Sequence, residues 1–168
     1  DFCLSRGLGD VYKRQIFCVA NQKGGVGKTT TAVNLAAGLA QLNQRVLLVD
    51  LDPQGNATMG AGINKAELQS SIYEVLLGMA DVATARVTSE TGKFDVLPAN
   101  RELAGAEVEM VELDNREKRL KDALAVVDAE YDFMLIDCPP ALSMLTLNGL
   151  CAAHGVIIPM PVSYTHLR

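Results

Sequence analysis

Short apolar runs alternate with longer amphipathic stretches along most of the chain. Most of the apolar runs are continuous, and they occupy residues 16–20, 46–49, 94–98, 133–136 and 155–160. Continuous runs of this length are typical of strands buried on both faces of a parallel sheet. Helical patterns lie between them, at residues 29–42, 70–78, 100–112 and 115–130. The alternation predicts an α/β domain with a mostly parallel sheet flanked by helices.

Helix-capping residues indicate where several of these helices begin and end. The second helix has Ser70 or Ser71 as a candidate N-cap and Gly78 as its stop. Serine side chains accept hydrogen bonds from free N–H groups at a helix start, and glycine tolerates the left-handed conformation after a helix end. We expect the third and fourth helices to open on Asn100 and Asn115.

The two ends of the chain do not fit this pattern. "GDVYKRQ" within residues 1–15 and "VSYTHLR" at residues 162–168 resemble translated sequencing-adapter read-through at the ends of metagenomic gene fragments. Such segments are set aside before the fold is considered. We therefore expect the domain to occupy residues 16–161, to be incomplete at its C-terminus, and to leave one flank of its sheet uncovered.

Composition and charge exclude few classes of protein. A length of 168 residues suffices for one medium domain with its own core. A net charge of −5, from 15 basic and 20 acidic residues, gives no bulk sign of nucleic-acid binding. No apolar run approaches the roughly 18 residues that would span a bilayer, and no signal peptide is evident.

The cysteines give no sign of a metal or redox motif. Cys3, Cys18, Cys138 and Cys151 form no C-x-x-C pair. Without a secretory signal they are expected to be free thiols in a reducing compartment.

The stretch "NQKGGVGKTTT" follows the first predicted strand and opens the first predicted helix. A standard phosphate-binding loop is spelled G-x-x-x-x-G-K-[ST]. Gly27, Lys28 and Thr29 fill its last three places, but Gln22 stands where the first glycine belongs. A second lysine, Lys23, follows immediately. The stretch is therefore a variant of the loop with an additional cation.

The residue types of this loop suit a bound nucleotide. Gly24, Gly25 and Gly27 permit close backbone approach, so that successive N–H groups can surround phosphate oxygens at a helix N-terminus. Lys28 is expected to reach the β- and γ-phosphates, and the Thr29 hydroxyl to bind Mg²⁺.

Carboxylates follow two other predicted strands. Asp50 ends the second strand, Asp52 lies in the turn after it, and Asp137 ends the strand at 133–136. Ligands of open parallel sheets bind beyond the carboxyl ends of the strands. Asp137 is therefore predicted to hold Mg²⁺ through water, as a Walker B carboxylate. Asp52 is predicted to orient the attacking water and is a further candidate for Mg²⁺ binding through water, although it could also simply form an Asp-Pro turn.

These motifs resemble those of a known family. "KGGVGKTT", "VLLVDLDPQGN" and "FMLIDCPP" resemble the deviant Walker A ATPases of the MinD/ParA superfamily, and among them the ParA/Soj chromosome and plasmid partition ATPases. "LPANRELAGAEVE" and "LTLNGLCAAHGVIIPMP" continue the resemblance, which covers about residues 16–161. It implies a P-loop NTPase-like fold, ATP and Mg²⁺ as cofactors, and Mg-dependent ATP hydrolysis.

The resemblance also gives roles to individual residues. Lys23 corresponds to a signature lysine that reaches the partner's nucleotide across an ATP-bound dimer, which makes Lys23 and Asp52 the implied catalytic residues. Contact of Lys23 with only its own phosphates or with solvent stays open. The "DPQGNAT" and "DCPP" segments resemble switches I and II, and Asp50 resembles a structural acid. The implied nucleotide-binding residues are Lys23, Gly24, Gly25, Val26, Gly27, Lys28, Thr29 and Thr30.

The implied partners are those of partition ATPases: a second copy of the chain, a ParB-like centromere-binding protein, and nonspecific DNA bound through C-terminal residues absent from this chain. The resemblance implies a cytoplasmic, nucleoid-associated protein with no membrane partner. One alternative is a MinD-like membrane-surface ATPase, although that type typically lacks "DPQGN". Another is an inactive nucleotide-binding fragment. A nitrogenase-type iron protein would need paired cysteines, and Cys138 has no second cysteine in the expected place.

Overall fold

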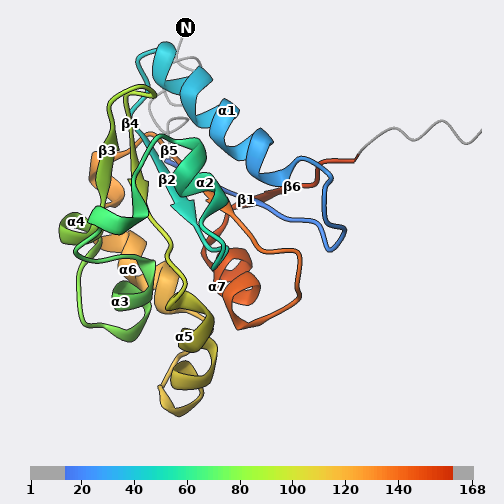
Figure 1. The fold of residues 1–168 in the computed structure, drawn as a ribbon, viewed down its shortest axis with the longest axis vertical. Helices are drawn as coiled ribbons and strands as arrows, with labels where there is room; N and C mark the ends of the chain where they lie inside the picture. The colour runs from blue at the N-terminus through green and yellow to red at the C-terminus, as the bar shows by residue number, and fades with distance from the viewer. Residues whose placement is uncertain (1–13, 161–168) are drawn as a thin grey trace, which may run out of the picture.

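A computed structural model describes residues 14–160 of the chain. Six strands form one sheet in the order β3-β4-β2-β5-β1-β6 (Figure 1). Their bounds are β1 (Gln15–Val19), β2 (Val46–Asp50), β3 (Val87–Ser89), β4 (Phe94–Leu97), β5 (Phe133–Asp137) and β6 (Gly155–Ile157). All neighbouring strands pair in parallel except β3, which is antiparallel to β4. The prediction of a mostly parallel sheet is confirmed.

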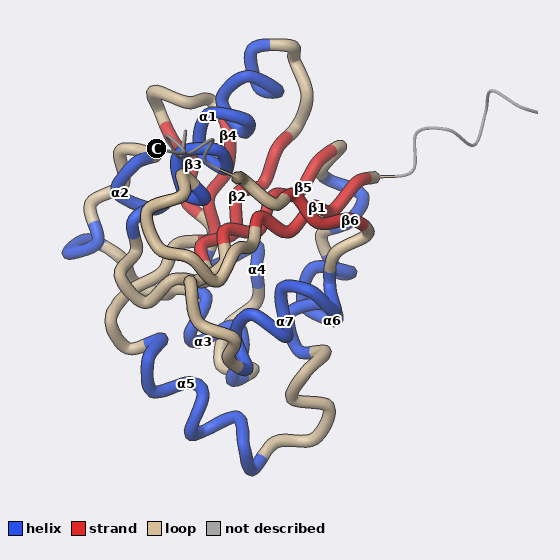
Figure 2. The backbone as a smooth tube through the Cα atoms, turned by 90° about the vertical axis from the view of Figure 1, so that its right-hand side faces the viewer, coloured by secondary structure: helices blue, strands red, loops and turns tan. Residues whose placement is uncertain are grey.

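Helices cover both faces of the sheet (Figure 2). Helices α1 and α2 lie on one face, and α3 to α7 lie on the other. The α-helices are α1 (Lys28–Gln41), α2 (Asn56–Gly60), α3 (Ile72–Leu77), α4 (Val82–Ala85), α5 (Leu103–Glu109), α6 (Arg119–Val126) and α7 (Met144–Ala152). Short 3₁₀ turns occur at η1 (Lys65–Glu67), η2 (Met110–Glu112) and η3 (Asp128–Glu130).

The central strands explain why their apolar runs are continuous. Successive strand side chains point to opposite faces of a sheet. Leu47 and Val49 accordingly pack among α3 to α7, whereas Leu48 packs with α1 and α2. Because both faces are covered, polar residues would have no solvent to face along these strands.

The capping prediction for α3 is confirmed at Ser71 rather than Ser70. The Ser71 side chain accepts a hydrogen bond from the backbone of the first turn, while Glu74 accepts one from the Ser71 N–H. Gly78 ends the helix in the left-handed region at φ 77°. This reciprocal arrangement is a capping box, and it satisfies N–H groups that would otherwise lack partners.

Two predicted helix starts were wrong. Helix α5 begins at Leu103 and α6 at Arg119, each several residues after the asparagine expected to open it. Asn115 instead adopts a left-handed φ of 52°, and the Asn100 side chain accepts a hydrogen bond from Glu102 N–H in a turn. Asparagine favours both conformations because its short polar side chain bonds to nearby backbone.

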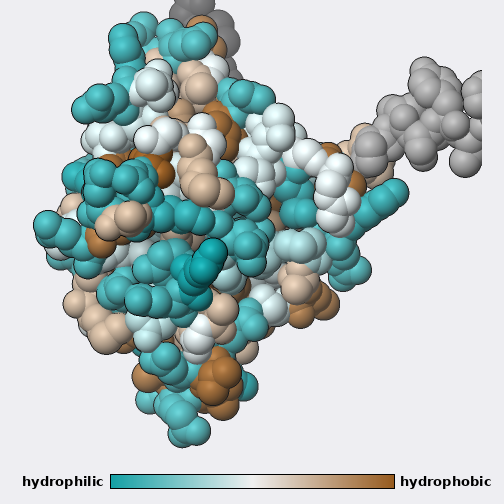
Figure 3. Space-filling view, in the orientation of Figure 1, coloured by the Kyte–Doolittle hydropathy of each residue, from teal (hydrophilic) through white to brown (hydrophobic). Residues whose placement is uncertain are grey.

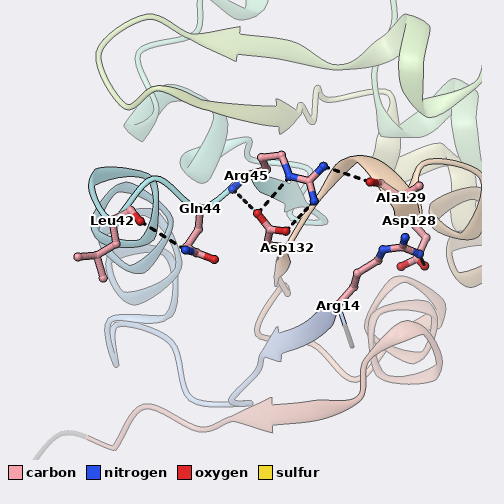
Figure 4. Close-up of polar contacts among 7 residues, drawn as sticks. All are labelled: Arg14, Leu42, Gln44, Arg45, Asp128, Ala129 and Asp132. Carbon is pink, nitrogen blue, oxygen red and sulfur yellow. Dashed lines mark hydrogen bonds and ion pairs between the residues drawn. The ribbon is translucent and has the colours of Figure 1, made fainter. Parts of the chain in front are cut away.

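Polar contacts link neighbouring segments at the amino ends of the parallel strands (Figure 4). The Arg45 guanidinium donates to both carboxylate oxygens of Asp132, at 2.6 and 3.1 Å, and to the Ala129 carbonyl at 3.2 Å. Arg14 pairs with Asp128 nearby. The Arg45 hydrogen bond lowers the pKa of Asp132. These contacts join the loop after α1 to the start of β5.

The boundaries of the domain differ slightly from expectation. Gln15, which was set aside with the N-terminal end, is the first residue of β1 and pairs with Phe133. Strand pairing uses backbone N–H and C=O groups, so a residue of any type, including one from an adapter-derived segment, can extend a strand. The rest of the two predicted adapter-derived ends, residues 1–13 and 162–168, lies outside the described residues.

The surface is mostly hydrophilic on the face viewed in Figure 3. Strand β6 forms one edge of the sheet, and Val156 within it and Ile158 and Met160 after it are exposed. Among the described residues, no helix has the length and apolar character needed to cross a membrane.

Candidate nucleotide-binding site

Three central strands end at the same level of the sheet. Asp137 of β5 is the register partner of both Val19 on β1 and Asp50 on β2. The backbone hydrogen bonds continue one step further, from Leu51 N–H to the Asp137 carbonyl and from Cys138 N–H to the Val19 carbonyl. The loop after β1, the carboxylate of Asp137 and the turn after β2 therefore lie at one edge of the sheet, as the sequence predicts.

The loop between β1 and α1 has a glycine-rich backbone with free space beside it. Gly25 and Gly27 adopt left-handed φ values of 71° and 87°, which non-glycine residues rarely adopt. A Cβ atom added at Gly24, Gly25 or Gly27 would meet no heavy atom within 4 Å. The space beside the loop is thus free of protein atoms, as a ligand requires.

The two lysines of the loop have different environments. Lys28 is buried, and its Nζ donates to the Lys23 carbonyl at 3.3 Å. Lys23 is exposed, and its backbone N–H donates to the Asn21 side chain at 2.9 Å. The Asn21 amide in turn donates to the Pro159 carbonyl at 2.9 Å. Lys28 is therefore held inside the loop, while Lys23 faces solvent.

Asp137 is a buried carboxylate at the end of β5. Its exposure is 0%, and no described donor reaches either carboxylate oxygen at normal hydrogen-bond distance and angle, although the Thr29 hydroxyl lies close enough to interact with it. Burial raises its pKa to about 7; the Thr29 hydroxyl, in the first turn of α1, lowers it, and the charges of Asp50 and Asp52 raise it further. Buried carboxylates are normally hydrogen-bonded, paired or bound to metal. This unsatisfied group therefore fits a bound cation.

Asp50 has the opposite environment. It is also 0% exposed, but its Oδ2 accepts from the Thr58 N–H and hydroxyl, each at 2.8 Å, and its Oδ1 accepts from Asp52 N–H at 3.1 Å. Burial raises its pKa to about 6, against the lowering effect of these hydrogen bonds. All its described contacts are structural.

Asp52 lies in the turn after β2 and is half-buried. Its Oδ1 accepts from Gln54 N–H at 2.9 Å, and its carbonyl accepts from Gly55 N–H at 2.8 Å. Asp52 thus shapes the turn, as the simpler interpretation anticipates, while one carboxylate oxygen keeps capacity for a water or ligand. Its catalytic role stays a prediction.

The predicted metal ligands do not form an all-protein cage. Within residues 14–160, no group of three or more His, Cys, Asp or Glu side chains could hold a metal ion. Mg²⁺ commonly binds through one or two protein oxygens together with water and substrate phosphates. The Thr29 hydroxyl and the Asp137 carboxylate fit that mode.

Two features at this edge were not predicted from sequence. Thr58, in α2, is fully buried against Asp50, and Lys65 Nζ donates to the Gln54 carbonyl at 2.6 Å. The sequence places Thr58 at the end of "DPQGNAT", the segment that resembles switch I, but a small polar residue after a strand-end aspartate is common in turns and does not by itself indicate a buried contact with Asp50.

The cysteines behave as predicted wherever they are described. Cys18, Cys138 and Cys151 are free. Cys18 and Cys138 are buried with their sulfur atoms 3.2 Å apart, on the face of the sheet covered by α3 to α7. They act as small apolar side chains of the core.

The comparisons with known proteins agree with this arrangement. The chain is 53% identical over 154 residues to the chromosome partitioning protein ParA of Myxococcus xanthus, covering 92% of this chain and 54% of that protein. It is 51% identical to the sporulation initiation inhibitor protein Soj of Bacillus subtilis, covering 92% of this chain and 61% of that protein.

A solved structure, cobyrinic acid a,c-diamide synthase from Mycobacterium smegmatis with bound ATP analog and magnesium, is 49% identical with a TM-score of 0.85. That similarity covers 88% of this chain and 60% of the solved chain. The chain thus spans little more than half the length of these relatives. The family model for an AAA domain, AAA_31, matches residues 14–168. With the P-loop NTPase-like sheet and its partition-protein relatives, this shows that the chain belongs to the AAA_31 family, among proteins of the ParA/Soj type.

Proposed function

We propose that this chain is the nucleotide-binding part of a ParA/Soj-like partition ATPase that binds ATP with Mg²⁺ and hydrolyses it. The observation that carries the proposal is the buried Asp137 carboxylate, which accepts no hydrogen bond of normal geometry from residues 14–160 and lies beside the Thr29 hydroxyl of the loop. The similarity to ParA, to Soj and to a solved relative with bound ATP analog and magnesium supports the choice of ligand.

Each residue of the site has one proposed task. Backbone N–H groups from Gly24 to Thr29 surround the phosphates, and the buried Lys28 neutralises their charge. Thr29 and, through water, Asp137 would hold Mg²⁺, which would supply charge stabilisation during phosphoryl transfer. Asp52 orients the attacking water.

Lys23 has a different proposed task because it is exposed. In an ATP-dependent dimer it contacts the partner's phosphates, as an arginine finger does in other phosphoryl-transfer enzymes. The dimer would therefore depend on the nucleotide state. Nonspecific DNA binding, a ParB-like partner and a nucleoid-associated cytoplasmic location belong to the same proposal, and they concern the longer protein.

The name of the solved M. smegmatis relative raises a second candidate, ATP-dependent amide synthesis. The chain shares with it the part of the fold that contains the loop. If ATP is hydrolysed to release phosphate when only DNA and a partner protein are added, with no carboxylic acid substrate, the partition function is favoured. Phosphate release that requires a carboxylic acid and an amine donor favours synthesis.

The hydrolytic role is tested in the full-length product of the source gene. Asp52→Ala is expected to bind ATP but release no phosphate, and so to accumulate as an ATP-bound dimer in size-exclusion chromatography. Asp122→Ala on α6 removes a similar charge from an exposed site and serves as the control. If Asp52→Ala hydrolyses ATP at the parent's rate, the role assigned to Asp52 is wrong. ATP turnover by the isolated 168-residue chain that is lost in Lys28→Ala would exclude the inactive-fragment alternative.

A further inference from the structure

Thr58 joins three segments at the carboxyl edge of the sheet. Its N–H and its hydroxyl both donate to Asp50 Oδ2, at 2.8 Å each, which ties α2 to the end of β2. Its hydroxyl oxygen also accepts from Ala99 N–H at 3.0 Å, which ties α2 to the segment after β4. A threonine hydroxyl can donate one hydrogen bond and accept others, so a single side chain holds both connections.

The Thr58 junction is fully buried. Thr58, Asp50 and Ala99 are each 0% exposed, so water cannot replace a lost hydrogen bond without entering the core. An unpaired buried donor or acceptor is costly, and more so when the acceptor is a carboxylate. The hydrogen bonds at Thr58 therefore restrict α2 to one position relative to β2.

The same junction controls the turn that carries Asp52. Asp50 uses its second oxygen, Oδ1, to accept from Asp52 N–H, so the carboxylate that anchors Thr58 also anchors the backbone of Asp52. From the far side, Lys65 Nζ donates to the Gln54 carbonyl at 2.6 Å. The segment from Asp52 to Thr58 is thus held at its start by Asp50, in its middle by Lys65 and at its end by Thr58.

We propose that Thr58 is a positioning residue for ATP hydrolysis: its hydroxyl holds the Asp50 carboxylate and the segment after β4 together, and thereby fixes Asp52 where it can orient water. This inference rests on the proposed function, because it takes Asp52 as the residue that acts on water. Thr58 is fully buried against Asp50, so we expect nucleotide binding not to depend on it. A displacement of about 1 Å at a reacting group can slow a reaction by about 100-fold.

The test compares variants at Thr58 with a buried hydroxyl elsewhere, all in the full-length protein. Thr58→Val keeps the shape of the side chain and removes the hydroxyl, Thr58→Ala removes it without adding a methyl group, and Thr58→Ser keeps it. Ser89→Ala is the matched control, since the Ser89 hydroxyl is also buried and donates to the Ala61 carbonyl at 2.7 Å, in β3 at the far edge of the sheet. Affinity for MgATP, turnover and melting temperature are measured, with turnover determined below each melting temperature.

The positioning role predicts a specific pattern across these variants. Thr58→Val and Thr58→Ala are expected to lower kcat by roughly 10- to 100-fold while the Kd for MgATP stays within about twofold. Thr58→Ser is expected to restore most of kcat. Ser89→Ala is expected to lower the melting temperature while leaving kcat unchanged.

Two outcomes would overturn the inference. One is parent kcat in the folded Thr58→Val or Thr58→Ala variant, and the other is an equal loss of kcat in Ser89→Ala at a similar melting temperature. Asp52→Ala separates this failure from that of the proposed function. If Asp52→Ala keeps parent turnover, the proposed role of Asp52 has failed; if it loses turnover while the Thr58 variants keep it, only the role of Thr58 has failed.

Discussion

Asp50 and Asp137 are register partners on the adjacent parallel strands β2 and β5, and both are fully buried. They differ in their hydrogen bonds: Asp50 accepts from the N–H and hydroxyl of Thr58 and from Asp52 N–H, whereas Asp137 has only the nearby Thr29 hydroxyl and accepts no hydrogen bond of normal geometry among the described residues. A buried carboxylate supplied with donors can remain in place by itself, and one without donors needs a cation. The pair therefore divides into an acid supplied with protein donors and an acid that we propose binds a cation.

The unpaired state of Asp137 predicts that its neutral analogue is no less stable in the absence of ligand. Asp137→Asn is expected to unfold at the same temperature as the parent, or a higher one, in EDTA at pH 8, because it removes an uncompensated buried charge. It is also expected to lose the stabilisation that MgATP gives the parent. Thermal unfolding by circular dichroism, with and without MgATP, measures both effects. A large loss of stability in EDTA would show that Asp137 has structural partners.

Stability of the ligand-free protein is expected to decrease as pH rises from about 4 to about 7. Burial raises the pKa of Asp50 to about 6 and that of Asp137 to about 7, from an ordinary value of 3.8. In this window the folded state binds more protons than the unfolded state, so raising the pH favours unfolding. The two carboxylates are expected to lower the free energy of unfolding by on the order of 1–4 kcal/mol over this pH range.

Urea denaturation at pH 5 and pH 8, without Mg²⁺ or nucleotide, measures this difference. The contribution of Asp137 is absent from Asp137→Asn, so that variant should show a smaller decrease between the two pH values. An equal decrease in the parent and the variant would assign the effect to other groups.

Glycines in the loop should differ in their tolerance of alanine. Gly25→Ala and Gly27→Ala place a side chain at φ values of 71° and 87° and are expected to cost about 1–2 kcal/mol each in free energy of unfolding. Gly24→Ala is the control, because Gly24 is outside the left-handed region and an added Cβ meets nothing within 4 Å. Chemical denaturation distinguishes them, and equal costs at all three glycines would contradict the account.

Lys23 and Lys28 should affect different steps. In the full-length protein, Lys23→Ala is expected to keep ATP binding and to lose the ATP-dependent dimer, since Lys23 is exposed and free to reach a partner. Lys28→Ala is expected to weaken ATP binding by at least about tenfold, because hydrogen bonds to charged groups are worth about 1.5–3 kcal/mol. Nucleotide titration and sedimentation velocity measure the two steps. A Lys23→Ala variant that still dimerises with ATP would place Lys23 on its own phosphates or in solvent.

The elements predicted best are those whose patterns reflect burial on two sides. The run at 46–49 became β2 because every residue of β2 is buried. Strand β3 has two exposed residues and pairs antiparallel at the edge of the sheet, so it leaves no such run. Helix α7 is apolar with many buried residues and has no polar stripe, and a helix covered on several sides lacks the periodicity used for prediction.

The candidate site divides in the same way. The loop and the acids at the strand ends follow from local motifs. Their convergence follows from the rule that the carboxyl ends of parallel strands lie along the same side of a sheet. The difference between Asp50 and Asp137 does not, because it depends on the side chain of Thr58, which folding places between Asp50 and the distant Ala99 N–H. Hydrogen bonds between segments far apart in the chain have no signature in either segment alone.

The most direct test of the central claim is the binding of ATP to the 168-residue chain, measured by isothermal titration calorimetry with Mg²⁺ and with EDTA. The account predicts binding that requires Mg²⁺ in the parent, binding weakened by at least about tenfold in Lys28→Ala, a loss of the Mg²⁺-dependent binding in Asp137→Asn, and parent affinity in the exposed-lysine control Lys121→Ala. Binding of equal strength in the parent and in Lys28→Ala, or no binding in a folded parent, would contradict it.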